Sequence, residues 1–133
     1  MINSRNLNHL APLAKTKCDQ FLIGCRLHEI DVMVYCTYRD EESQNALYAI
    51  GRTLKGHILT NKRGGESKHN HKIDGFPASL AFDAVPLIHG KCDWKNNAAY
   101  LKMGVIAESI GLKWAGRWQG SLKERANGQH GAD

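Results

Sequence analysis

The stretch SKHNHKIDGFPASLAFDAVP (residues 67–86) contains two histidines, a turn and then an aspartate inside a run of hydrophobic residues. Asp83 lies between Phe82 and Ala84, in a segment that we expect to be a buried strand. A carboxylate in a core is unfavourable unless it is paired with a cation or coordinates a metal. The sequence therefore predicts a cationic partner for Asp83, unless the segment is a surface loop that only looks buried.

The residues before this strand predict a hairpin. The run DGFP (residues 74–77) supplies turn residues, and the strand is expected over residues 81–87, closed by Pro86. His69 and Asp83 are fourteen positions apart, so only such a hairpin could bring them together. Both are zinc ligands by type. Spacing alone leaves an alternative, a surface histidine and an aspartate bound to the backbone.

The rest of the chain predicts helices and strands without a regular alternation. Strands are expected over residues 30–38 and, as a short aromatic strand, after Gly111. Helices are expected over residues 12–27, 41–52 and 94–110. Asp40 is the expected N-cap of the second helix and Asp93 that of the third. This order indicates an α+β fold, with an antiparallel sheet and about three helices. A single domain over residues 1–133 is expected, with a polar C-terminal tail from about residue 120.

Composition narrows the classes of function. The net charge of +5 and the pI near 9.1 favour an anionic partner, but the basic residues are scattered, which does not favour a nucleic-acid-binding protein. No apolar run of about 18 residues predicts a membrane span, and the N-terminus shows no secretory signal, so we expect synthesis in a cytoplasm. The four cysteines form no CxxC pair and are expected to be free, mostly buried thiols.

Three blocks of sequence occur in a recognisable order: VYCTYRDEESQNALYAIGRT (residues 34–53), SKH followed by SLAFD (residues 67–83), and GLKWAGRW (residues 111–118). They resemble the TxRxxxxQxxLYxxGRT, SxHxxGxAxD and GLxWGGxW blocks of the VanY-like zinc peptidases. That family comprises D-alanyl-D-alanine carboxypeptidases and phage L-alanyl-D-glutamate endopeptidases. The resemblance covers about residues 7–129, and the phage endolysin branch is the most similar.

The resemblance implies a cleft that holds one zinc ion, with His69 and Asp83 as two of its ligands. His71 is a competing candidate, but only His69 stands two residues after Ser67, as the family block places it. A zinc ion would also be the cationic partner that Asp83 requires. It would polarise the scissile carbonyl and acidify a bound water, whose proton a nearby carboxylate would accept.

The third ligand is where the sequence departs from the family. In the family, the catalytic carboxylate comes three residues before a histidine ligand; here Glu124 fits the carboxylate position, but Asn127 occupies the histidine position. Asparagine is a poor zinc ligand. Three interpretations stay open: His130 supplies the third ligand, the site uses Asn127 or two protein ligands plus water, or the chain is catalytically impaired.

Two further residues are implied to contact substrate. Arg39 would bind a substrate carboxylate or stabilise the oxyanion of the tetrahedral intermediate, with a surface salt bridge as the alternative. Gln44 would position the substrate or only cap the helix.

The function that the resemblance implies is a zinc-dependent peptidoglycan peptidase, cutting stem peptides at the L-alanyl-D-glutamate bond and acting as a phage endolysin in host cell lysis. The expected partner is bacterial peptidoglycan, with no nucleic acid, no stable membrane association and a monomeric state. The enzyme would be made in the host cytoplasm and reach the periplasm and cell wall after the membrane is permeabilised. The alternative is a catalytically impaired or non-catalytic murein-binding domain on the same fold.

Overall fold

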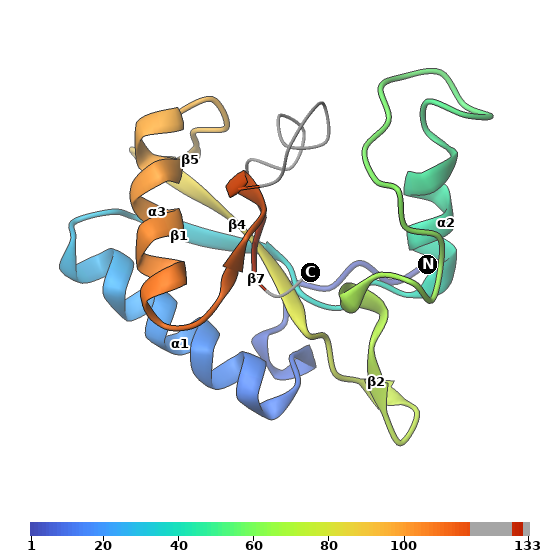
Figure 1. The fold of residues 1–133 in the computed structure, drawn as a ribbon, viewed down its shortest axis with the longest axis horizontal. Helices are drawn as coiled ribbons and strands as arrows, with labels where there is room; N and C mark the ends of the chain where they lie inside the picture. The colour runs from blue at the N-terminus through green and yellow to red at the C-terminus, as the bar shows by residue number, and fades with distance from the viewer. Residues whose placement is uncertain (118–128, 132–133) are drawn as a thin grey trace.

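The computed structural model describes residues 1–117 and 129–131 (Figure 1). This part of the chain contains three α-helices, α1 (Pro12–Leu27), α2 (Glu41–Ala49) and α3 (Asn97–Ser109). Its strands are β1 (Val32–Cys36), β2 (Lys72–Ile73), β3 (Phe76–Pro77), β4 (Ala81–Ile88), β5 (Lys91–Cys92), β6 (Lys113–Trp114) and β7 (Gln129–Gly131). Short 3₁₀ turns are η1 (Leu7–His9), η2 (Lys68–Asn70) and η3 (Ala115–Arg117). The predicted α+β class is confirmed.

Strand β4 lies at the centre of an antiparallel sheet with the order β1-β4-β7-β6, and β5 pairs with the end of β4. Asp83 is paired with Cys36 of β1 on one side and with Gln129 of β7 on the other. The C-terminal residues that were expected to be a polar tail therefore include a strand of the central sheet. Strands β2 and β3 form a separate hairpin.

Helices α1 and α3 pack together on one side of the sheet, whereas α2 lies apart, beyond the end of β1 (Figure 1). The core between α1, α3 and β4 contains Phe21 and Phe82, whose ring centroids are 5.5 Å apart, and the buried Met103. This core fixes the position of β4 and hence of Asp83. Among the helices of the described residues, none has the length and hydrophobicity needed to span a bilayer.

The expected helices form, with differences at their ends. The N-cap of α2 is confirmed, because the Asp40 side chain accepts a hydrogen bond from the Ser43 N–H. However, α2 ends at Ala49, three residues earlier than predicted. Helix α3 starts later than predicted: its N-cap is Asn96, and Asp93 instead accepts a hydrogen bond from the Asn96 side chain at 3.0 Å.

The hairpin and the strand are also present, with two corrections. Asp74 and Gly75 have positive φ values of 51° and 79°, as a tight turn between strands requires, while Phe76–Pro77 form β3 rather than the turn. Pro86 does not close β4, which continues to Ile88. The chain can continue through Pro86 because its carbonyl still accepts a hydrogen bond, from the Asp93 N–H at 2.8 Å.

Candidate metal centre

A short turn holds His69 rigidly. Ser67 caps η2: its hydroxyl accepts a hydrogen bond from the His69 N–H at 3.2 Å, and the Asn70 side chain bonds back to the Ser67 N–H. The His69 carbonyl accepts a hydrogen bond from the Arg39 N–H at 3.0 Å, which joins this turn to the end of β1. Ser67, two residues before the histidine, therefore has a structural role as the cap of this turn. The side chain of His69 is fully buried.

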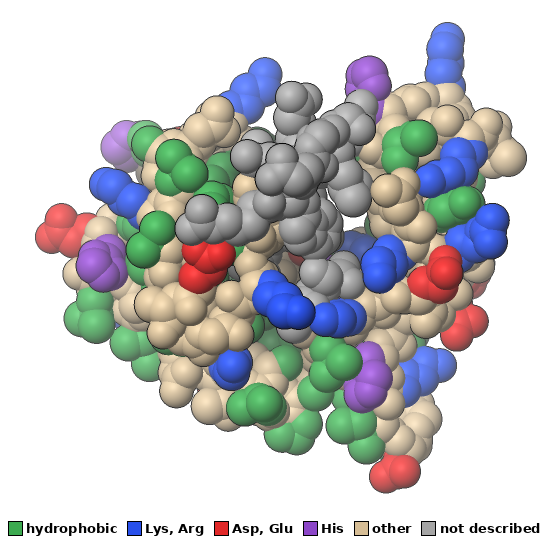
Figure 2. All heavy atoms as spheres, viewed as in Figure 1, with side chains coloured by type: hydrophobic (Ala, Val, Ile, Leu, Met, Phe, Trp, Pro, Cys, Tyr) green, Lys and Arg blue, Asp and Glu red, His purple; other side chains and the backbone are tan. Residues whose placement is uncertain are grey.

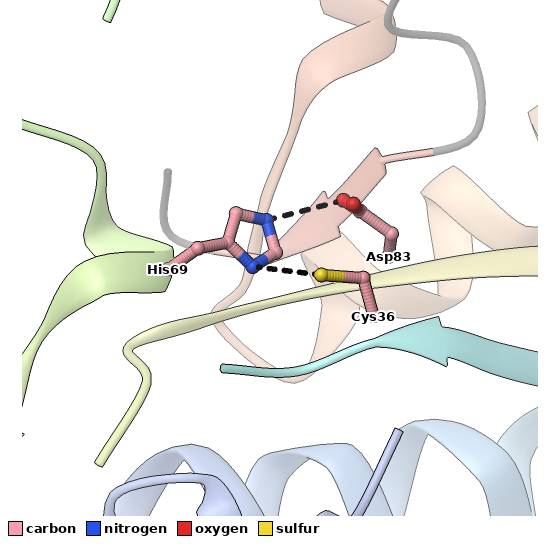
Figure 3. Close-up of side chains that lie close together, drawn as sticks. All are labelled: Cys36, His69 and Asp83. Atoms are coloured by element: carbon pink, nitrogen blue, oxygen red, sulfur yellow. Dashed lines mark hydrogen bonds and ion pairs between the residues drawn. The ribbon is translucent and has the colours of Figure 1, made fainter. Parts of the chain in front are cut away.

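The imidazole of His69 has a defined tautomer. Its Nδ1 lies 2.8 Å from the carbonyl oxygen of Thr37. A carbonyl only accepts hydrogen bonds, so Nδ1 carries a hydrogen and donates it. The other nitrogen, Nε2, faces the Asp83 carboxylate, with 3.3 Å between Nε2 and Oδ1 (Figure 3). A histidine held in this way through Nδ1 is oriented to bind a metal through Nε2.

The two facing atoms have no hydrogen-bond partner. His69 Nε2 and Asp83 Oδ1 are both buried, and although they are 3.3 Å apart they are not aligned as a hydrogen bond. Zinc binds nitrogen and carboxylate oxygen at about 2.0–2.2 Å with tetrahedral geometry, which separates two ligand atoms by about 3.3 Å. The pair therefore fits a bound zinc ion, and nothing else in the described residues satisfies these two atoms.

Two side chains of the protein itself provide positive charge beside Asp83. Burial by itself would lower the pKa of His69, but the negative charge of Asp83 outweighs burial and raises the pKa above its ordinary value. Asp83 thus has two positively charged neighbours, the His69 imidazolium and the Arg39 guanidinium, whose Nη2 lies 3.5 Å from Oδ2. The prediction that Asp83 has a cationic partner is confirmed.

Cys36 is a third potential ligand, and the sequence analysis did not single it out. One ligand atom each from Cys36, His69 and Asp83 lie within 4.8 Å of one another, and all three residues are buried. The Cys36 Sγ atom lies 3.7 Å from His69 Nδ1 (Figure 3). The four cysteines were expected to be free and mostly buried. This is confirmed, since all four are free, three are buried and Cys92 is partly exposed.

Arg39 and Gln44 are buried beside this group and bind each other. Arg39 Nη1 donates to the Gln44 side-chain oxygen at 2.9 Å, and Arg39 Nη2 contacts Cys36 Sγ at 3.3 Å as well as Asp83. Gln44 is only 1% exposed and donates to the Lys62 carbonyl at 2.8 Å. The structure therefore brings Arg39 to the candidate metal centre, and the substrate-binding roles of both residues stay predictions.

Two further histidines were considered as ligands. His71 is exposed, its Nδ1 lies 2.8 Å from the Ala78 carbonyl, and it does not belong to the ligand group formed by the described residues. His130 belongs to β7, where its partners are Phe82 and Trp114, while Gln129 is the residue paired with Asp83.

Glu124 and Asn127 lie outside the described residues. The roles proposed for His130 as third ligand and for Glu124 as base stay predictions.

Comparison with known proteins places the chain in a family. No protein-family model matches it. A curated relative, the peptidoglycan L-alanyl-D-glutamate endopeptidase CwlK of Bacillus subtilis (strain 168), is 33% identical over 120 residues, which covers 83% of this chain and 67% of the relative. Together with the three sequence blocks, this similarity shows that the chain belongs to the VanY-like family that includes the peptidoglycan L-alanyl-D-glutamate endopeptidases.

Proposed function

We propose that this chain is a zinc-dependent peptidase that cuts the stem peptides of peptidoglycan, at the bond between L-alanine and D-glutamate. The observation that carries the proposal is the buried pair of unpartnered atoms, His69 Nε2 and Asp83 Oδ1, 3.3 Å apart. The pair occurs in a chain related to an endopeptidase with that named specificity.

The residues have distinct proposed roles. His69 and Asp83 hold the metal, and Arg39 compensates the buried charge of Asp83 through its 3.5 Å contact. Zinc, when bound, supplies a Lewis acid that polarises the scissile carbonyl and lowers the pKa of a bound water. Glu124 accepts a proton from the attacking water and passes it to the leaving amine.

The test uses purified protein and purified peptidoglycan. With one equivalent of zinc, the protein should release new amino groups from the wall, and mass spectrometry of the fragments should show N-terminal D-glutamate. His69→Ala should lose both zinc and hydrolysis. His71→Ala is the matched control, because His71 is an exposed histidine two positions away, and it should keep both. Full hydrolysis by the chelated protein or by His69→Ala would refute the proposal.

The biological role that we propose is that of a phage lysis enzyme. The enzyme would be made in the host cytoplasm and act on the wall once the membrane has been permeabilised. Figure 2 shows Lys and Arg side chains spread over the visible face. Scattered positive charge of this kind suits attraction to an anionic cell wall, whereas nucleic-acid-binding proteins usually concentrate it in one stripe. Expression in a bacterium should leave turbidity unchanged until a membrane-permeabilising agent is added, and then cause lysis. Lysis by His69→Ala under the same conditions would contradict this role.

Asn127 favours a second candidate, a domain that binds murein without cutting it. Pelleting with purified peptidoglycan in the absence of hydrolysis, together with no zinc on the purified protein, would support this candidate. Bound zinc with hydrolysis that disappears in Glu124→Ala would reject it.

A further inference from the structure

Cys36 sits at the candidate metal centre because of an irregularity in the sheet. Along β1 and β4, Val34 is paired with Ala84, but the next pair is Cys36 with Asp83, so β1 contains one extra residue at this point. A β-bulge of this kind redirects the following side chain, and bulges are frequent next to active sites. Without it, Tyr35 would be opposite Asp83. The bulge thus places a thiol, rather than a phenol, beside the carboxylate.

A cationic side chain lies beside the thiol. Arg39 Nη2 is 3.3 Å from Cys36 Sγ, and both residues are buried. The thiol hydrogen is donated to the Asn3 side-chain oxygen at 3.0 Å. Cys36 is 1% exposed, so no solvent competes for the sulfur.

Two unpartnered atoms point to a ligand beside the thiol. His69 Nε2 and Asp83 Oδ1 are buried, in residues that are 0% and 3% exposed. Cys36 Sγ, a ring nitrogen of His69 and a carboxylate oxygen of Asp83 all lie within 4.8 Å of one another. We propose that Cys36 is the third protein ligand of the metal, in a Cys-His-Asp set that does not need a histidine at position 127. This rests on the proposed metal dependence but not on the bond that is cleaved.

The charge balance favours this set. On binding, the S–H bond of Cys36 breaks, its proton leaves to solvent, and a sulfur–zinc bond forms. The charge of Zn²⁺ is then balanced by one thiolate and one carboxylate, which matters in a buried site that already contains the Arg39 guanidinium. A neutral third ligand would leave one more uncompensated positive charge there. Thiolate, imidazole and carboxylate are all established zinc ligands.

The first experiment replaces zinc by cobalt and measures the absorption spectrum. The wild-type protein should show a sulfur-to-cobalt charge-transfer band in the near ultraviolet, and Cys36→Ser should lose the band. Competition with a chelator should show that Cys36→Ser weakens zinc binding by more than about 100-fold, the largest effect usual for a residue that only supports a ligand. Cys18→Ser is the matched control, because Cys18 is equally buried but lies in α1, and it should keep both the band and the affinity.

A second measurement needs no variant, so it decides the matter even if Cys36→Ser does not fold. X-ray absorption of the zinc-loaded wild-type protein should show one sulfur at about 2.3 Å together with nitrogen and oxygen ligands. A zinc shell without sulfur in the wild-type protein would overturn the proposal. A sulfur ligand in a protein that does not cleave peptidoglycan would confirm the ligand and refute the proposed function, so the two failures are distinguishable.

Discussion

His69 and Asp83 each have one side-chain atom that contacts the protein and one that has no hydrogen-bond partner. Thr37 engages His69 Nδ1, and Arg39 contacts Asp83 Oδ2, so Nε2 and Oδ1 are the atoms that remain. Such supporting contacts fix the tautomer and rotamer of a ligand before the metal arrives. This explains why a carboxylate can be stable inside β4: its charge is compensated on both sides, by Arg39 and by the protonated imidazole or a metal.

Arg39→Met tests this compensation in the absence of metal. The variant keeps a long apolar stem but removes the guanidinium next to Asp83, whose side chain is 4% exposed. Breaking a buried charge pair usually costs about 3 kcal/mol or more. We expect the free energy of unfolding, measured by urea titration with chelator present, to fall by about that amount. The control is Arg52→Met, which removes an exposed guanidinium stacked on Tyr48 and should lower the free energy of unfolding by less than about 1 kcal/mol. Equal losses of unfolding free energy in the two variants would contradict the compensation of Asp83 by Arg39.

Helix α2 matters to the site because it carries Gln44, the partner of Arg39. Its N-cap, Asp40, accepts a hydrogen bond from the Ser43 N–H at 2.8 Å and another from the Ile2 N–H at 2.8 Å. The hydrogen bond from the Ser43 backbone is the main cause that lowers the pKa of Asp40 below its ordinary value of 3.8. The cap therefore ties the N-terminal segment and α2 to the end of β1.

The lowered pKa gives this cap a pH dependence of definite sign. Because the folded state binds the Asp40 proton more weakly than the unfolded state, the stability from ionised Asp40 is present above about pH 3.8 and is lost as the pH falls through the folded pKa. Asp40→Asn keeps an acceptor for Ser43 but carries no charge. We expect wild type to be more stable than Asp40→Asn at pH 6, and the difference to shrink towards pH 3, in urea titrations. A difference that grew on acidification would contradict the assignment.

The contact between α3 and β6 leaves no room for a side chain at Gly104. A Cβ atom there would lie 2.3 Å from the Trp114 ring, which is itself buried. Alanine has the higher helix propensity by about 1 kcal/mol, but overpacking of this severity costs more. We expect Gly104→Ala to lower the free energy of unfolding by about 2 kcal/mol in a urea titration. Gly90→Ala is the control for backbone strain alone, because its φ is +76° and its Cβ would meet nothing within 4 Å; a smaller loss, of about 1 kcal/mol, is expected.

Signals between neighbouring residues predicted most of the helices, strands and turns. Features that depend on pairing with distant residues were not predicted. The periodicity of α1, the Asp40 cap and the Asp74-Gly75 turn depend on neighbouring residues, and all three are confirmed. The cap of α3 was assigned to Asp93 because both Asp93 and Asn96 are good N-caps, and only packing of the helix decides between them. The bulge before Cys36 has no glycine or proline to mark it, since it arises from pairing with β4.

The candidate site extends over distant parts of the chain, which limited its prediction in the same way. His69 and Asp83 were found from a motif and from the cost of burying a carboxylate. Cys36 was not, because its proximity depends on the register between β1 and β4. The position of β7 between β4 and β6 is another consequence of long-range pairing, and it places Gln129 rather than His130 opposite Asp83. A sequence pattern does not encode such a register.

The ligand candidates come from β1, η2 and β4, which are distant from one another along the chain. A bound metal would therefore link these three segments in the folded state. A ligand that binds only the folded state stabilises it by RT ln(1 + [L]/Kd), which is about 2.7 kcal/mol when free zinc is 100 times Kd. We expect zinc at that ratio to raise the free energy of unfolding of the wild-type protein by about this amount, and excess chelator to reverse the change. The gain should be absent in His69→Ala, whereas Cys92→Ser, which alters a partly exposed thiol outside the ligand group, should keep it. If zinc stabilised His69→Ala as strongly as wild type, the metal would be bound elsewhere, and His69 and Asp83 would be only a buried ion pair.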